Sequence, residues 1–243
     1  MHELITDFGR VCVGLPDELF AEAARLGLAA CRVAAQGQFT WALTGGSTPK
    51  AWYHWCVDRR ALPAEVLAAT HWFASDERCV PLTSDESNFG SAQRQMLSLL
   101  GVPAAQQHPW PAMPDPREAV RLFAKEVERI TGVGRCFGLC FLGLGDDAHT
   151  ASLFPGSALL TGVDTAHFAA VEVPDRGSRL TITPAGLRAC HQIVVMATGA
   201  AKAAAVERVF RGSEGVSAVP AKVLFDCASR VTWLLDADAA ARL

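Results

Sequence analysis

Short apolar runs alternate along this chain with longer segments in which apolar positions recur at helical spacing. The runs predict strands at residues 39–43, 71–75, 137–142, 167–173, 192–197 and 231–235. The helical spacing predicts helices over residues 15–35, 49–58, 91–100 and 117–130, another that begins with residues 198–202, and a short alanine-rich one after residue 235. Strands that alternate with helices are typical of a parallel sheet with both faces covered. We therefore predict an α/β fold that forms one domain over residues 1–243.

The loop after the run at residues 137–142 carries the clearest candidate chemistry. It reads Gly143-Leu-Gly-Asp-Asp-Ala-His-Thr-Ala-Ser-Leu-Phe-Pro-Gly-Ser157. Ligands of open α/β sheets bind outside the carboxyl ends of the strands, where this loop begins. A tight loop can bring Asp147 to His149, and a carboxylate beside an imidazole holds it in one tautomer. We predict that His149 is a general base oriented by Asp147; an ordinary role beside a helix N-terminus is the alternative.

Three other interpretations of this loop are weaker. Residues 143–148 match a loose G-x-G-x-x-A dinucleotide fingerprint, but Asp146 and Asp147 lie where a pyrophosphate needs backbone amides. Ser152 and Ser157 lack the G-x-S-x-G turn that exposes a nucleophilic serine. No HExxH motif or comparable third ligand accompanies the acid and the histidine, so a zinc hydrolase is not favoured and we expect no metal.

A second glycine-containing turn follows the first predicted strand and reads Thr44-Gly-Gly-Ser-Thr-Pro49. Gly45 and Gly46 let the backbone approach a ligand, Thr44 and Ser47 supply hydroxyl groups, and the following helix presents free amides to an anion. The turn is not a Walker A loop, because no Gly-Lys-Ser/Thr ending is present. We predict a phosphate cradle here, with a simple helix cap as the alternative.

Three cations near other strand ends are candidates for the same site. Arg78 is suited to bidentate pairing with a phosphate, and Asp76 or Glu77 would fix its direction; a salt-bridged surface loop is the plainer alternative. Arg179 lies in a segment that we expect to bring two arginines to a loop edge. Lys202 would lie in the first turns of a helix, which disfavours a cation unless an anion is shared there, although a solvated lysine remains an alternative.

Composition limits the partners that this chain could have. Half of its residues are hydrophobic, 19% are charged and the net charge is -3, without a long basic run, so neither nucleic acid nor a membrane surface is favoured. No leader pattern begins the sequence and no apolar run reaches membrane-spanning length, so we expect a cytoplasmic protein. The eight cysteines lie mostly in apolar segments, and we expect them to be reduced core residues.

Several motifs carry a resemblance that covers nearly the whole chain: Leu43-Thr-Gly-Gly-Ser-Thr-Pro49, Asp76-Glu-Arg78 with Ser87-Asn88, Gly143 through Gly156, Arg179-Leu-Thr, Gly199-Ala-Ala-Lys202 and Trp233-Leu-Leu-Asp236. Together they resemble the 6-phosphogluconolactonase family. The resemblance implies a three-layer α/β/α sandwich with a mostly parallel, Rossmann-like sheet. It also implies hydrolysis of 6-phospho-D-glucono-1,5-lactone to 6-phospho-D-gluconate, the second step of the pentose phosphate pathway, without a metal or other cofactor.

The family's base, the histidine of an Asp-Gly-His-Thr-Ala-Ser-Leu-Phe-Pro-Gly motif, falls on His149. Asp76, Glu77 and Asn88 are expected to support the site. The phosphate and the developing negative charge would be held by Thr44, Gly45, Gly46, Ser47, Arg78, Arg179 and Lys202. The chain departs from the motif at Ala148, where the family usually has glycine; an alanine resists some conformations that glycine adopts, so the loop geometry depends on its fit.

Two alternatives accompany this interpretation. Glucosamine-6-phosphate deaminases share the fold, and their loop looks like Asp-Gly-His-Ile-Ala-Phe-Asn-Glu-Pro-Gly, whose acidic residue falls on Phe154 here. Amine transfer needs that additional acid/base group, so Phe154 favours the lactonase. A non-catalytic phosphosugar-sensing module is the other alternative, but no basic helix-turn-helix pattern precedes Leu43. We expect a phosphosugar lactone as the partner and a monomer or weak dimer as the assembly.

Overall fold

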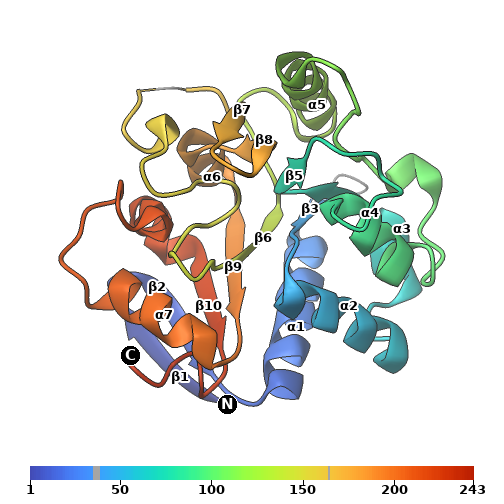
Figure 1. Ribbon diagram of the computed structural model, residues 1–243. Helices are drawn as coiled ribbons and strands as arrows, with labels where there is room; N and C mark the ends of the chain where they lie inside the picture. Colours follow the sequence, from blue (N-terminus) through green and yellow to red (C-terminus); the bar gives the residue numbers. More distant parts are fainter. Residues whose placement is uncertain (35–38, 164) are drawn as a thin grey trace.

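The computed structural model describes residues 1–34, 39–163 and 165–243. A central sheet contains seven strands: β1 (His2–Thr6), β2 (Gly9–Val13), β3 (Phe39–Leu43), β4 (Thr70–Ala74), β6 (Leu139–Gly143), β9 (Gln192–Ala197) and β10 (Val231–Leu235). Their order is β1-β2-β10-β9-β6-β3-β4, and only the β1–β2 pair is antiparallel (Figure 1). The predicted mostly parallel α/β sheet, flanked by helices, is confirmed.

A second, smaller sheet lies beside the carboxyl end of the central one. It pairs β5 (Asp76–Arg78), β8 (Gly177–Ile182) and β7 (Phe168–Val173) in an antiparallel order β5-β8-β7 (Figure 1). The backbone of Ser75 joins the two sheets, since its amide donates to Leu43 of β3 and its carbonyl accepts from Ile182 of β8. This sheet carries Asp76, Arg78 and Arg179 on paired strands.

Seven α-helices occur in the described residues: α1 (Pro16–Val33), α2 (Ser47–Arg59), α3 (Ala64–Ala69), α4 (Asn88–Ala92), α5 (Pro116–Thr131), α6 (Pro184–Ala189) and α7 (Ala203–Phe210). Helix α1 begins where Pro16 occupies the first turn, and the Glu18 carboxylate accepts from the amide of Leu15. Its expected end at Ala35 lies outside the described residues. None of the helices described is long and apolar enough to cross a bilayer.

The central strands are largely apolar, because helices pack against the sheet from outside and few side chains of these strands meet water. Every residue of β3 is buried. Trp41 in this strand stacks on Trp72 of β4 with ring centroids 5.1 Å apart, and meets Phe141 of β6 edge-on at 5.0 Å. Helix α2 adds Trp52, which contacts Trp41 at 5.6 Å. Burial of these large rings fixes the spacing of β6, β3 and β4.

Most predicted elements match the structure, and the exceptions have physical causes. The run at residues 167–173 forms β7 of the small sheet, and residues 174–183 contain β8, so Arg179 lies on a strand where a loop was expected. Asp76 and Arg78 likewise belong to a strand. The helix predicted from residue 91 begins earlier, at Asn88, and continues as a π-helix over Gln93–Leu97. The alanine-rich end forms turns, and the β1–β2 hairpin was not predicted.

The cysteines match the prediction only in part. All eight are unpaired, and six are buried. Cys31 is half-buried and Cys79, next to β5, is exposed, so the prediction that they are all core residues is wrong for these two. Cys79 directly follows β5, an edge strand of the small sheet, and its side chain is exposed there.

A buried ion pair ties the edge hairpin to α1. Glu22 of α1 accepts from Arg10 Nη1 of β2 at 2.6 Å and from Arg25 Nε at 2.6 Å. Burial raises the pKa of Glu22, but the hydrogen bonds from Arg25 and Arg10 lower it more, so its pKa lies below the usual value. The ionised carboxylate therefore stabilises the fold above pH 4.5, and this contribution is lost as the pH falls from there through the lowered pKa.

Glu22→Gln should lower the free energy of unfolding by about 1.5–3 kcal/mol at pH 7, because three charge-assisted hydrogen bonds from Arg10 and Arg25 lose their anion. The deficit should shrink as the pH falls below 4.5, since the unfolded wild type then takes up a proton and the folded carboxylate follows at its lower pKa. Urea denaturation at pH 7 and pH 3.5 measures both. Glu118→Gln removes an exposed pair with Arg121 on α5 and should lower the free energy of unfolding far less, because water screens that pair. Equal deficits in the two variants would contradict the role of Glu22.

Candidate active site

Four neighbouring strands of the central sheet end at one cleft. In sheet order these are β9, β6, β3 and β4, and each is followed by one segment of the candidate site. The cleft has a volume of about 230 Å³. Its lining joins segments from all four strand ends: Thr44, Gly45, Gly46, Ser47, Thr48, Pro49, Asp76, Arg78, Asn88, Gly143, Leu144, Gly145, His149, Ala151, Met196 and Lys202. The chain reverses direction across the sheet between β3 and β6, which is where open α/β folds bind ligands.

The turn after β3 places the amino end of α2 at the cleft. Gly46 caps the helix with φ of 109°, a backbone conformation that disfavours side chains. A Cβ on Gly45 would lie 1.9 Å from Asn88 Oδ1, so a glycine is also required for Asn88 to approach. The carbonyl of Thr44 accepts from the Tyr53 hydroxyl at 2.7 Å, which holds the turn against α2. Free amides and the hydroxyl of Ser47 thus face the cleft, as an anion site requires.

The loop after β6 brings its carboxylate and imidazole together. Asp147 Oδ1 accepts from the amide of His149 at 3.0 Å and contacts His149 Nδ1 at 2.5 Å. Burial raises the pKa of Asp147, but these hydrogen bonds lower it further than burial raises it, so the carboxyl stays ionised. Because Asp147 engages Nδ1 as an acceptor, Nε2 is the ring nitrogen that remains to accept a proton. Asp147 itself lies behind the histidine and does not line the cleft.

Ala148 adopts the conformation for which a glycine was expected. Its φ is 65°, and its side chain is fully buried. Backbone hydrogen bonds hold it there: its amide donates to Gly145, its carbonyl accepts from Ala221, and the amide of Gly145 donates to His149. A left-handed alanine costs about 1–2 kcal/mol, which is comparable to one or two of these bonds. The substitution is therefore accommodated, and the Asp147–His149 contact is kept.

The imidazole contacts both backbone and a second ring. A Cβ at Gly145 would lie 2.0 Å from His149 Nδ1, so the imidazole rests directly against the backbone there. Phe154 also packs on the imidazole, with ring centroids 4.3 Å apart. The guanidinium of Arg176, from the β7–β8 turn, lies 5.0 Å above the Phe154 ring. These contacts leave His149 little rotational freedom.

Two buried carboxylates support the cleft from β5. Asp76 accepts from Ser152 Oγ at 2.8 Å and from Asn88 Nδ2 at 3.2 Å. Burial raises the pKa of Asp76, and Ser152 together with nearby cations only partly offsets this. Glu77 points the other way and does not line the cleft. Burial raises the pKa of Glu77, and the four hydrogen bonds that it accepts offset this rise only in part. Alternating strand geometry explains why neighbours face opposite sides.

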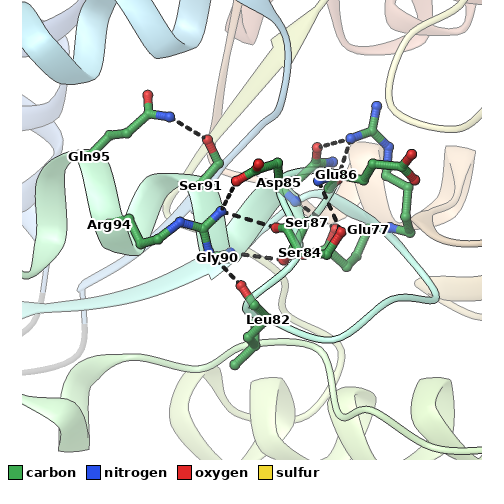
Figure 2. Close-up of polar contacts among 12 residues, drawn as sticks. Glu77, Leu82, Ser84, Asp85, Glu86, Ser87, Gly90, Ser91, Arg94 and Gln95 are labelled. Atoms are coloured by element: carbon green, nitrogen blue, oxygen red, sulfur yellow. Dashed lines mark hydrogen bonds and ion pairs between the residues drawn. The ribbon is translucent and has the colours of Figure 1, made fainter.

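Glu77 holds the loop that follows β5. It accepts from the amides of Asn88 and Phe89 at 2.7 and 2.9 Å and from Ser87 Oγ at 2.9 Å, and Ser87 in turn caps α4 by accepting from Gly90 (Figure 2). Arg94 secures the same loop from α4's continuation by donating to backbone carbonyls of residues 82 and 84 (Figure 2). This loop delivers Asn88 to the cleft, so Glu77 supports the site from a distance.

Arg78 and Arg179 are direct cross-strand partners in the β5–β8 pair. Arg78 Nη1 donates to Asn88 Oδ1 at 3.0 Å and to the carbonyl of Glu86 at 2.5 Å. Burial and the nearby Arg78 guanidinium both lower the pKa of Arg179. Like charges directly opposite one another destabilise a strand pair. No carboxylate within 4.0 Å pairs with either arginine in the described part of the chain, so an anion between them would be strongly attracted.

Lys202 ends a 3-10 turn, Ala200–Lys202, and occupies the N-cap position of α7. Its ammonium lies in the cleft and contacts Asp146 Oδ1 at 2.6 Å. The helix therefore begins with a cation that already has a carboxylate partner, which matches the expectation that an anion is shared here.

The described residues contain no group of three or more His, Cys, Asp or Glu side chains arranged to hold a metal ion. The cleft therefore offers cations, hydroxyl groups, backbone amides and one oriented imidazole. Such a set can bind a phosphorylated ligand and remove a proton from a water molecule beside it.

A protein-family model matches residues 15–233, which is most of the chain. It describes glucosamine-6-phosphate isomerases/6-phosphogluconolactonase. The chain belongs to this family. Among family members, the 6-phosphogluconolactonase of Synechocystis sp. is 35% identical over 216 residues and 87% of each chain, and that of Rattus norvegicus is 33% identical over 242 residues, 94% of this chain and 90% of its own.

A solved structure of the 6-phosphogluconolactonase from Trypanosoma brucei has the same fold as this family member. The TM-score is 0.82 at 28% sequence identity, over 96% of this chain and 98% of that one. The match extends over both sheets, because nearly all of each chain is superposed. The mostly parallel, Rossmann-like architecture expected from the sequence motifs is therefore confirmed.

Most of the residues that the sequence predicts for the site line the cleft. Three of them do not line it. Glu77 lies behind Asn88, Asp147 lies behind His149, and Arg179 lies behind its cross-strand partner Arg78. Sequence reasoning missed the side chains that contact these from elsewhere, namely Asp146, Ser152, Arg176 and Arg208, whose Nη1 donates to the Asp147 carbonyl at 3.4 Å. Helix α7 brings Arg208 to the loop that carries Asp147, and no pattern in the neighbouring sequence predicts that contact.

Glu77→Gln should lower the free energy of unfolding by about 1.5–3 kcal/mol, because an amide nitrogen would replace an oxygen that accepts two hydrogen bonds. One of the amides of Asn88 and Phe89 should also exchange with deuterium faster than in the wild type, because these amides donate to different oxygens of Glu77 and only one of those oxygens becomes an amide nitrogen. Denaturant titration and amide exchange measure the two effects. Glu86→Gln, at an exposed side chain of the same loop, is the control. If both variants behave alike, Glu77 does not hold the loop.

Proposed function

We propose that this chain is a 6-phosphogluconolactonase, which hydrolyses 6-phospho-D-glucono-1,5-lactone to 6-phospho-D-gluconate in the oxidative pentose phosphate pathway. One observation carries the proposal: an imidazole fixed by a carboxylate faces a cleft lined by cations and free backbone amides. The relatives at 33–35% identity that cover most of the chain bear this enzyme's name. Lactone hydrolysis needs only a water-activating base and donors for an oxyanion, and both are present.

In the proposed mechanism His149 Nε2 removes a proton from a water molecule, whose oxygen attacks the lactone carbonyl carbon. The carbonyl π electrons move to its oxygen and form a tetrahedral oxyanion. When the C=O bond re-forms, the bond from that carbon to the ring oxygen breaks. The imidazolium returns its proton to the ring oxygen, which becomes the product's hydroxyl group. Asp147 stabilises the imidazolium through Nδ1 and keeps the ring oriented.

The phosphate and the oxyanion are held, in this proposal, by Thr44, Gly45, Gly46, Ser47, Arg78, Arg179 and Lys202. The facing arginines favour the phosphate, because a dianion between them would relieve their repulsion and suits bidentate guanidinium pairing. Asp76, Glu77 and Asn88 support the site: Asn88 accepts from Arg78, while Asp76 and Glu77 position Asn88. No metal or other cofactor takes part in these steps.

The deaminase alternative is not favoured. A deaminase needs an acid/base group where Phe154 lies, and Phe154 instead packs its ring on His149. An oriented base that faces the cleft also speaks against a purely phosphosugar-sensing module. Ammonia release from glucosamine 6-phosphate would identify a deaminase, and binding without turnover of the lactone would identify a sensor.

We propose further that the protein acts in the cytoplasm as a monomer or weak dimer. All eight cysteines are free, which suits a reducing compartment. Most of the large exposed apolar side chains, such as Leu15, Leu99 and Val163, lie on separate segments, as on ordinary monomer surfaces. Analytical ultracentrifugation over a range of concentrations tests the assembly, and a stable oligomer at low concentration would contradict it.

His149→Ala should reduce lactone turnover by about 10²–10⁴, because the water loses its base. The rate must be measured above uncatalysed opening, for example by coupling the product to 6-phosphogluconate dehydrogenase. The control is His191→Ala, an exposed histidine at the opposite end of the sheet. A His149→Ala rate within about threefold of the wild type would sink the assignment.

Arg179→Met should raise KM for the lactone by about tenfold or more, because the phosphate loses a charged donor. The same variant should keep or raise the free energy of unfolding, by up to about 1 kcal/mol, since a like charge opposite Arg78 is removed while the apolar stem is kept. Steady-state kinetics and urea denaturation measure the two. Arg188→Met, at an exposed pair with Asp226, should leave KM unchanged. An unchanged KM in Arg179→Met would exclude Arg179 from phosphate binding.

A further inference from the structure

The cations in and beside the cleft fall into two kinds. Arg78 and Arg179 face each other and donate to neutral oxygens, those of Asn88, Glu86 and Ser178. The third cation, Lys202, is different, because the carboxylate of Asp146 already pairs with it. This carboxylate comes from the catalytic loop itself, one residue before the acid that orients the base.

The ion pair between Lys202 and Asp146 is short, and its two side chains differ in their exposure to water. Its atoms Nζ and Oδ1 are 2.6 Å apart, and the Lys202 side chain is only 22% exposed while that of Asp146 is 72% exposed. Lys202 lines the cleft and Asp146 does not. The ammonium therefore needs an anion at this place, whereas the carboxylate could be released to water at little cost.

The helix that follows strengthens the demand for an anion. Lys202 is the N-cap residue of α7, where the helix dipole is positive and a cation alone is unfavourable. Asp146 supplies negative charge to both the ammonium and the helix end. A phosphate in the cleft would supply more, because a phosphate monoester carries between one and two negative charges near neutral pH.

We infer that Asp146 is a built-in competitor of the substrate's phosphate: it holds Lys202 in the free enzyme and releases it when the phosphorylated ligand binds. The inference rests on the proposed function, since it assigns Lys202 to the ligand. A ligand that uses Lys202 must displace Asp146, so its affinity is reduced by the fraction of molecules in which the pair is closed. When product leaves, Asp146 recaptures the ammonium. Asp146 is thus a positioning residue that acts through Lys202.

A double-mutant cycle measured by isothermal titration calorimetry tests this. The proteins are the wild type, Asp146→Asn, Lys202→Met and the double variant, and the probes are 6-phospho-D-gluconate and inorganic phosphate. Asp146→Asn should bind both probes about two- to fivefold more tightly, which is the range expected for releasing a partly exposed pair. Lys202→Met should bind them more weakly. In the Lys202→Met background, Asp146→Asn should have no effect, because no ammonium remains to be freed.

Kinetics give a second readout. Asp146→Asn should lower KM for the lactone by the same two- to fivefold factor, and the effect should shrink at high salt. Asp226→Asn, which opens an exposed pair with Arg188 far from the cleft, matches the change in net charge and should alter neither affinity nor KM.

Two results would overturn the inference: no tightening in Asp146→Asn, or equal tightening with and without Lys202, which would mean simple repulsion between Asp146 and the ligand. A Lys202→Met variant that binds phosphate normally would overturn it as well. The proposed function fails separately, if the wild type does not hydrolyse the lactone; the cycle with inorganic phosphate still decides the inference in that case. Failure of the wild type to bind either probe would overturn the inference alone, because no phosphate would then compete with Asp146.

Discussion

Parallel pairing of β9, β6, β3 and β4 is the constraint on which the rest of this molecule depends. It brings four strand ends, far apart in sequence, to one edge of the sheet. The strands can lie together because their side chains are apolar on both faces and pack as large rings, including Trp41, Trp72 and Phe141. Since the loops start from fixed points, a few hydrogen bonds are enough to aim their side chains.

The small antiparallel sheet adds Asp76 and Arg78 to the cleft at the carboxyl ends of the central strands. It leaves the central sheet at Ser75, where one backbone bonds to both sheets, and then places two arginines opposite each other. That arrangement is unfavourable for the free protein and favourable once an anion is bound. Arg78 and Arg179 therefore repel each other, whereas Asp146 neutralises Lys202, and in the proposed function both arrangements affect the affinity for phosphate.

Sequence reasoning succeeded where an element is specified by its own residues. Burial on both faces makes a continuous apolar run, so β3, β6, β9 and β10 were located closely. It failed where pairing decides the state of a segment. Strand β8 has charged and polar residues and resembles a loop in sequence, and β1 is largely exposed, so neither has a strong periodic pattern. The last alanines favour a helix by propensity, but only turns form there.

The sequence by itself determined the α/β class, the glycine turn at Thr44–Pro49 and the pairing of Asp147 with His149, because these follow from local composition and short spacings. Only the tertiary structure decided that Ala148 fits a left-handed conformation, that Phe154 packs on the imidazole, and that Asp146 occupies Lys202. These depend on contacts between segments brought together by strand order. No run of neighbouring residues encodes such contacts, since the partners are separated along the chain or selected by packing.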